Sequence, residues 1–165
     1  MVFLTAVILT GCKNSNEATE TGQSAGETGN KLIAGATPPP NTREAQVLLR
    51  NWWVFEFYVV PGDRETSMAN RGRWYKFSAD GTFDTGQWQE NWGKGIWTLY
   101  YGGQYPVLHL VTENQESTGE WEIQGISGDE ETISLVGTRR YNQKGIAVKV
   151  INLLSKPTRK QFNME

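Results

Sequence analysis

The sequence predicts an all-β domain, a small up-and-down antiparallel barrel or strongly curled meander of about eight strands. Two observations favour this fold. Residues 45–154 are rich in aromatic and β-branched side chains, and Gly and Asp interrupt them about every 8 to 12 residues, which is the spacing of a small sandwich or barrel. Between these turns, apolar and polar residues alternate, so one face of each strand is apolar.

Eight segments show the alternation or are bounded by turn residues on both sides. They are Trp52–Val60, Arg73–Ser78, Thr82–Trp88, Ile96–Tyr101, Val107–Thr112, Gly119–Ile126, Thr132–Gly137 and Ile146–Ile151. Ahead of them, Glu44–Leu49 is expected to form one short helix.

One hairpin can be assigned a register from the sequence. Residues 79–81, Ala-Asp-Gly, fit a three-residue hairpin loop whose glycine takes the left-handed conformation. This loop places Phe77 opposite Phe83 and Lys76 opposite Asp84, on the two faces of the sheet. A shift of one residue would disrupt both pairs, so the register is well determined.

The same alternation assigns each strand a solvent-facing side and an inner side. The residues that mark the solvent-facing side are Glu56, Lys76, Asp84, Thr98, Glu122 and Lys149. The residues expected inside are Trp53, Phe55, Phe57, Tyr75, Phe77, Phe83, Trp97, Leu99, Leu108, Leu110, Trp121, Ile123, Ile133, Leu135, Val148 and Val150.

The N-terminal region predicts where the protein resides. Residues 1–11 have signal-peptide character, and Leu9-Thr10-Gly11-Cys12 resembles a bacterial lipobox. The resemblance implies cleavage before Cys12, the only cysteine, and attachment of acyl chains such as palmitate to it. More than one acyl chain gives stable anchoring, at about 0.8 kcal/mol per buried methylene. Lys13, standing where an Asp would indicate inner-membrane retention, favours the outer membrane.

Composition divides the remainder into three parts. Residues 12–44 are polar and rich in Gly, Ser, Thr and Pro, so they are expected to form a lipidated, disordered tether. Residues 45–154 form the barrel domain, and residues 155–165 are a basic tail expected to be solvated. Contact of this tail with lipid phosphates is the functional alternative.

Within the barrel region the chain resembles bacterial lipocalin-like lipoprotein domains. The resemblance rests on segments 51–52, 75–83, 95–99, 107–110, 119–123 and 133–135, and it spans about residues 48–154. It implies an envelope lipoprotein with a lipocalin-like barrel. Typical lipocalins bind small apolar molecules in the barrel mouth, although a shared fold does not establish a shared function.

The expected interior suggests a candidate ligand site and also argues against a deep one. A ligand in the barrel mouth would contact Trp53, Tyr75, Phe77, Trp97 and Trp121. An eight-stranded barrel holds either its own side chains or one small ligand, and large aromatic rings use up the space. The sequence therefore favours a largely filled barrel over a carrier with a deep cavity.

Other aromatic residues fall on the outer face: Trp52, Trp74, Trp88, Trp92, Tyr58 and Tyr100. Trp74, Trp88 and Trp92 are candidates for a surface that stacks on sugar rings or contacts an envelope protein. The alternative is cross-strand packing covered by loops or by the chain end. Exposure of both Trp88 and Trp92 is the condition for the glycan hypothesis.

Catalytic, metal and cofactor sites are not indicated. His109 is the only histidine and has no visible nucleophile or carboxylate partner, so an ordinary solvated or hydrogen-bonded role is favoured. The acidic residues between 113 and 131 match no calcium loop and are expected to be solvated. The net charge of −2 gives no electrostatic footprint for nucleic acid.

These observations together predict a non-enzymatic envelope lipoprotein whose barrel is a binding or interaction module. Two alternatives stay open. The first is a carrier of a small apolar ligand in the barrel mouth, and the second is a glycan-binding accessory that uses the exposed tryptophans.

Overall fold

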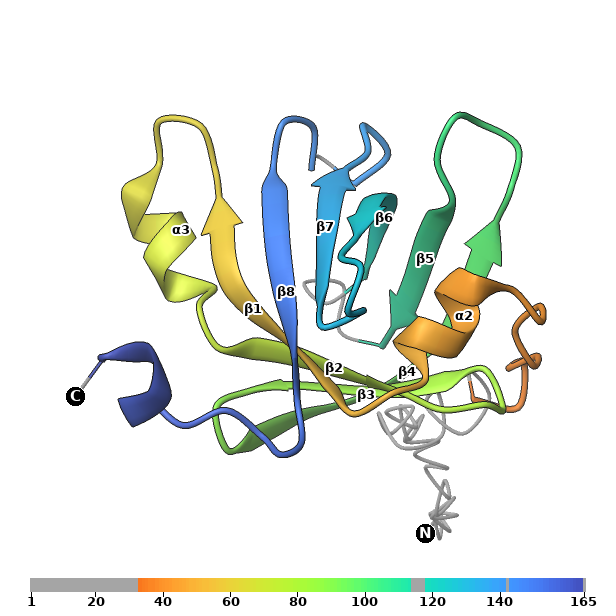
Figure 1. The fold of residues 1–165 in the computed structure, drawn as a ribbon, viewed down its shortest axis with the longest axis horizontal. Coiled ribbons are helices and arrows are strands. Elements are labelled where there is room, and N and C mark those ends of the chain that lie inside the picture. Colours follow the sequence, from red (N-terminus) through yellow and green to blue (C-terminus); the bar gives the residue numbers. More distant parts are fainter. Residues whose placement is uncertain (1–32, 114–117, 142, 165) are drawn as a thin grey trace, which may run out of the picture.

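The structure, a computed structural model, describes residues 33–113, 118–141 and 143–164. Eight antiparallel strands form one closed barrel in which each strand pairs with the next along the chain and β8 closes onto β1 (Figure 1). The predicted all-β, up-and-down barrel is confirmed.

The strands agree closely with those expected. They are β1 Trp52–Val59, β2 Arg73–Phe77, β3 Thr82–Gln87, β4 Glu90–Tyr100, β5 Val107–Thr112, β6 Gly119–Ile126, β7 Thr132–Gly137 and β8 Ala147–Leu153. The main difference is β4, which begins at Glu90 instead of Ile96. Residues 90–95 include two glycines and lack an apolar alternation, yet their backbone pairs with β3 through a register shift after Thr85.

The hairpin between β2 and β3 has the predicted register. Phe77 pairs with Phe83 and Lys76 pairs with Asp84. The loop glycine, Gly81, has a φ of +86°, which is the left-handed conformation that the loop type requires.

A β-bulge in β1 changes which side chains point inward. The pairing of β1 with β8 shifts between Phe55 and Phe57, so Glu56 is an extra residue in the strand. The alternation reverses beyond it, and Phe57 is 52% exposed while Tyr58 is 8% exposed in the core. The predictions that Phe57 points inward and that Tyr58 points outward were therefore wrong, whereas the other fifteen residues expected inside are buried.

Helix α2, Arg43–Leu48, closes part of the core. Its N-cap is Thr42, whose side chain accepts a hydrogen bond from the Ala45 amide. Ala45, Val47 and Leu48 are buried in the same cluster as the barrel interior. The short helix predicted here is thus present and one residue earlier than expected.

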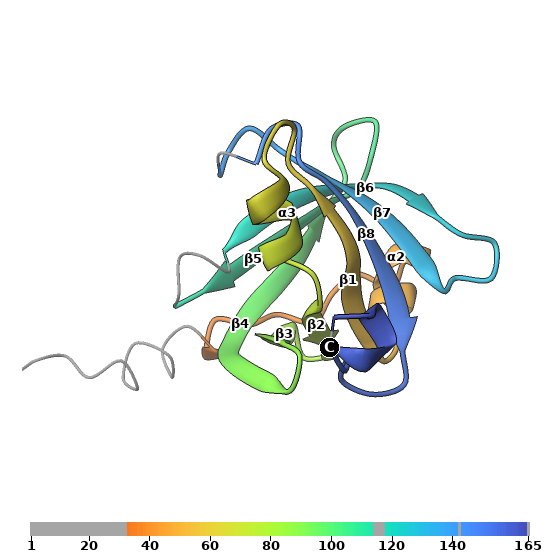
Figure 2. The ribbon, with the colours of Figure 1, turned by 90° about the vertical axis from the view of Figure 1, so that its left-hand side faces the viewer.

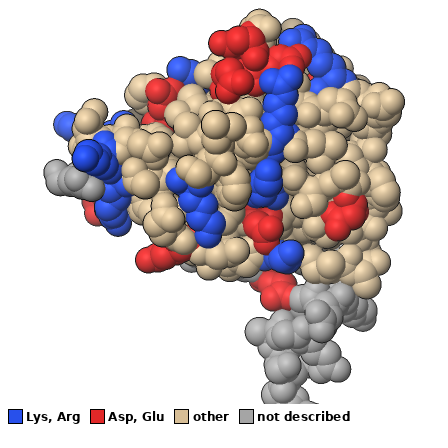
Figure 3. Space-filling model, turned by 60° about the horizontal axis from the view of Figure 1, so that its bottom comes forward, with Lys and Arg blue, Asp and Glu red and all other residues tan. Residues whose placement is uncertain are grey.

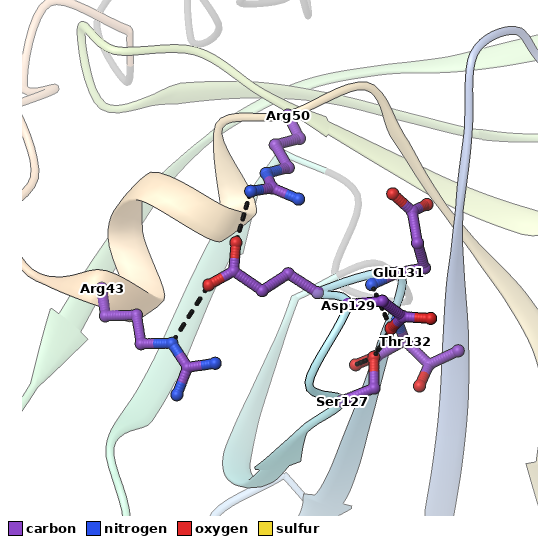
Figure 4. A network of polar contacts seen from close by, with 7 residues as sticks. Arg43, Arg50, Ser127, Asp129, Glu131 and Thr132 are labelled. Atoms are coloured by element: carbon purple, nitrogen blue, oxygen red, sulfur yellow. Dashed lines mark hydrogen bonds and ion pairs between the residues drawn. The ribbon is translucent and has the colours of Figure 1, made fainter.

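An acidic side chain in the loop between β6 and β7 fixes α2 to the barrel. Both oxygens of the Glu130 carboxylate are engaged, one with Arg43 and the other with Arg50 (Figure 4). The same loop is ordered by Asp129, which accepts hydrogen bonds from Ser127 and from the Glu131 amide. Part of the acidic run is therefore paired, although the sequence predicted a solvated face.

Helix α3, Arg64–Ala69, was not predicted. It begins after Asp63, whose carboxylate accepts a hydrogen bond from the Thr66 amide at 2.9 Å. The helix lies beside the second half of β1 (Figures 1 and 2). There it takes the place of β2, which pairs with β1 only at Trp53 and Val54.

The C-terminal segment folds back onto the barrel wall. A short 3-10 turn, η2 at Lys160–Phe162, buries the Phe162 ring against Trp88 at a centroid distance of 5.5 Å. The basic residues Arg159 and Lys160 are exposed, as expected of a solvated tail, but the segment is ordered against the wall through the buried Phe162. Across this face Lys and Arg are interspersed with acidic and uncharged side chains (Figure 3).

The chain that leads into α2 contacts the first hairpin. A Cβ placed on Gly81 would collide with the backbone carbonyl of Thr37. Residues 33–42, part of the predicted tether, therefore include a segment that packs on the barrel domain. Residues 1–32, with Cys12, lie outside the described residues.

Replacing two glycines separately tests this contact. Gly62 and Gly81 both have a positive φ, but only Gly81 has a neighbour within reach of an added Cβ. Gly62→Ala should lower the free energy of unfolding by about 1 kcal/mol, the cost of the left-handed conformation alone. Gly81→Ala should cost at least about 1 kcal/mol more in urea unfolding. Equal losses would show that Thr37 does not rest on the hairpin.

Candidate functional site

The five residues predicted to line a ligand site fill the barrel interior. Each is at most 2% exposed: Trp53, Tyr75, Phe77, Trp97 and Trp121. Tyr75 lies among the rings of Phe55 at 5.3 Å, Phe83 at 5.6 Å and Phe77 at 5.8 Å. These centroid distances are those of rings in direct contact, and all five candidate residues belong to the same buried core cluster.

Polar atoms of the buried rings are satisfied mainly by the backbone. Trp53 Nε1 donates to the Leu48 carbonyl of α2, and Trp97 Nε1 donates to the Ser78 carbonyl, each at 3.1 Å. Burial raises the pKa of the Tyr75 hydroxyl, with a smaller opposing effect from Arg73. The nearby Trp121 Nε1 also lowers that pKa. It makes no hydrogen bond to any residue that the structure describes.

The three outer tryptophans do not form one exposed surface. Trp74 is 1% exposed and Trp88 is 9% exposed, whereas Trp92 is 39% exposed. The C-terminal segment covers the first two, since Lys156 lies 4.8 Å from the Trp74 ring centroid and Phe162 packs on Trp88. This is the alternative of cross-strand packing under the chain end, and the condition for glycan binding through Trp88 and Trp92 is not met.

An open hollow of about 490 Å³ lies on the outer wall at the end of β4. Its lining consists of Tyr100, Gly102, Gly103, Val107, Glu120 and Arg140. The Tyr100 ring is 52% exposed and could stack on a flat ligand. Glu120 is already engaged, because it pairs with Arg140 at 3.2 Å and accepts a hydrogen bond from Thr138 at 2.9 Å. The hollow therefore suits a neutral polar group better than an ion.

His109 lies beside this hollow and is hydrogen-bonded, as the sequence favoured. Its Nε2 is 2.8 Å from the Tyr141 hydroxyl, and the two rings are stacked. Partial burial lowers the pKa of His109, the positive charge of Arg140 lowers it further, and Glu120 opposes both. These effects favour the neutral imidazole, whose hydrogen-bond partner is the Tyr141 hydroxyl.

A second hollow, about 220 Å³ in volume, forms a groove between β1 and α3. Its lining consists of Glu56, Phe57, Tyr58, Val59, Arg64, Ser67, Met68 and Arg71. A further hollow of about 280 Å³ shares Glu56 and Arg71 with it, so the two adjoin. No residue of this groove was a sequence candidate. The available signal was Asp63 followed by Glu65, because an Asp cap and an acidic residue in the first turn are typical of a helix start.

Among residues 33–113, 118–141 and 143–164, no cluster of three or more His, Cys, Asp or Glu residues could hold a metal ion. Within the same ranges no helix has the length and apolar character needed to cross a membrane.

Comparison with known proteins gives no match: no family model, curated protein or solved structure corresponds to the chain. Its function therefore has to be inferred from its own residues.

The lowered pKa of His109 leads to a pH-dependent prediction. The unfolded chain should titrate near about 6.5, so it binds more protons than the folded chain just below that pH. The contribution of His109 to the free energy of unfolding is then fully present above about pH 6.5. It is lost as the pH falls through the pKa of the folded state. Because the sequence has one histidine, its NMR titration is unambiguous.

The midpoint of that titration in the folded protein should lie below about 6.5. His109→Gln should weaken the fall in unfolding free energy between that midpoint and about pH 6.5. A midpoint at or above the unfolded value would contradict the burial and the Arg140 effect.

Proposed function

We propose that the chain is a non-enzymatic lipoprotein of the bacterial cell envelope, anchored by lipid on Cys12, whose lipocalin-like barrel is a rigid binding module. The observation that supports a binding module on the outer wall is that the chain's own aromatic rings occupy the barrel interior. Binding is therefore assigned to the outer wall, where the described hollows lie.

A carrier that holds its ligand in the barrel mouth is less well supported. Protein pockets that bind small molecules have volumes of about 300–1,000 Å³ and are largely formed before the ligand binds. The side chains that would line such a pocket here touch one another, with Phe77 and Trp97 at 5.1 Å. Opening room for a ligand would break these ring contacts, each worth about 0.5–1.5 kcal/mol beyond its burial.

A glycan-binding accessory that uses Trp88 and Trp92 is also weakened. Trp88 is covered by Phe162, and the guanidinium of Arg159 lies 5.2 Å from its ring centroid. Trp92 is only partly exposed, and the guanidinium of Arg73 lies 5.3 Å from its ring centroid. An interaction with another envelope protein is the use that we assign to the exposed ring of Trp92.

The anchor in this proposal comes from the sequence. The lipobox-like residues 9–12 follow an apolar stretch of signal-peptide character. Several acyl chains on one cysteine would hold the protein stably at a membrane. Lys13 after the cysteine favours the outer membrane in this account.

Replacing the proposed acylation site tests the anchor. Cys12→Ala should move the protein from the membrane fraction to the soluble fraction after cell lysis, because no acyl chain can be attached. Lys13→Gln, which keeps the thiol, should stay with the membranes. Mass spectrometry of the wild-type N-terminal peptide should show acyl chains on Cys12. An unacylated Cys12 in membrane-bound wild-type protein would refute the proposed anchor.

A further inference from the structure

The groove between β1 and α3 has an apolar wall that faces solvent. Phe57 is 52% exposed, Val59 is 50% exposed and Met68 is 40% exposed, and all three line the groove. Large apolar side chains gathered in one hollow on a protein surface are typical of a ligand or partner site.

The fold places these side chains there for a specific reason. The bulge at Glu56 turns Phe57 outward, and α3 occupies the side of β1 that β2 leaves after Val54. Ser67 of α3 accepts a hydrogen bond from the Val60 amide at 3.0 Å, which fixes the helix next to the strand end. The groove is therefore a built feature outside the barrel, separate from its interior.

The charged side chains of the groove are unbalanced. Glu56 lines both hollows as well, and its Oε2 lies 2.8 Å from Lys149 Nζ, which offsets its negative charge although this buried oxygen accepts no hydrogen bond in the described part of the chain. Among the described residues, neither Arg64 nor Arg71 has an acidic partner. Arg71 Nε is buried and has no hydrogen-bond acceptor in the described part of the chain. A buried donor without an acceptor is costly, and a bound anion would satisfy it.

We infer that this groove binds a single-chain anionic amphiphile, such as a fatty acid carboxylate. Its acyl chain would lie along Phe57, Val59 and Met68, and its carboxylate would accept hydrogen bonds from Arg71. Arg71 lines both adjoining hollows, of about 220 and 280 Å³, so the head group would sit where they meet. This site needs neither the lipid on Cys12 nor space inside the barrel.

Calorimetric titration of the full chain with sodium dodecanoate, below the concentration at which it forms micelles, tests the inference. The chain is made in a membrane-free cell-free system so that it carries no acyl chains of its own. One equivalent of dodecanoate should bind. Dodecyltrimethylammonium, which has the same chain and the opposite charge, should bind at least about tenfold more weakly.

Matched variants assign the site. Phe57→Ser and Arg71→Gln should each weaken dodecanoate binding by about tenfold or more. Leu154→Ser removes an apolar side chain that is 85% exposed and lines none of the hollows, and Lys94→Gln removes a cation that does not line the groove, so each should change binding less than about twofold. Because Phe57 is exposed, its variant should fold normally, and the unfolding transition checks this for all four.

Three results would overturn the inference. These are no dodecanoate binding, equal binding of the cationic amphiphile, or binding that Phe57→Ser and Arg71→Gln leave unchanged. Since none of these results depends on acylation, they leave the test of the Cys12 anchor unaffected.

Discussion

An eight-stranded barrel encloses a space that has to be filled, either by side chains or by a ligand. In this protein aromatic rings from β1, β2, β3, β4 and β6 fill it, and α2 adds Val47 and Leu48 to the same cluster. With only one cysteine in the chain, no intramolecular disulfide is available, so this packing supplies the stability. The filled interior also determines where function can reside, because it leaves the outer wall for binding.

Strand positions and most of the core could be predicted because a two-residue alternation is a local signal. It failed where one extra residue, Glu56, reversed the alternation in β1, because a bulge leaves no mark in composition. The alternation also gave no sign of α3, a helix of only six residues, none of which is buried. The folded C-terminal segment depended on Phe162, a single apolar residue whose partner Trp88 is remote in sequence.

One candidate site could be predicted from the sequence, and the other could not. The interior residues Trp53, Tyr75 and Trp121 were predictable as inward-facing, and their burial in the packed core reduces their value as a ligand site. The groove at Phe57 and Arg71 could not be predicted, because it requires the bulge, the departure of β2 and the position of α3 together. Such a surface comes from tertiary structure and not from any motif.

The most direct test of the filled barrel is to enlarge a buried side chain and measure the free energy of unfolding. Val150 on β8 is 1% exposed in the interior, whereas Ala147 on the same strand is exposed and gives a matched control. A full interior predicts that Val150→Phe lowers the free energy of unfolding by about 1–3 kcal/mol while Ala147→Phe changes it little. Wild-type or higher stability of Val150→Phe would mean that the barrel has room to spare, and it would contradict the account.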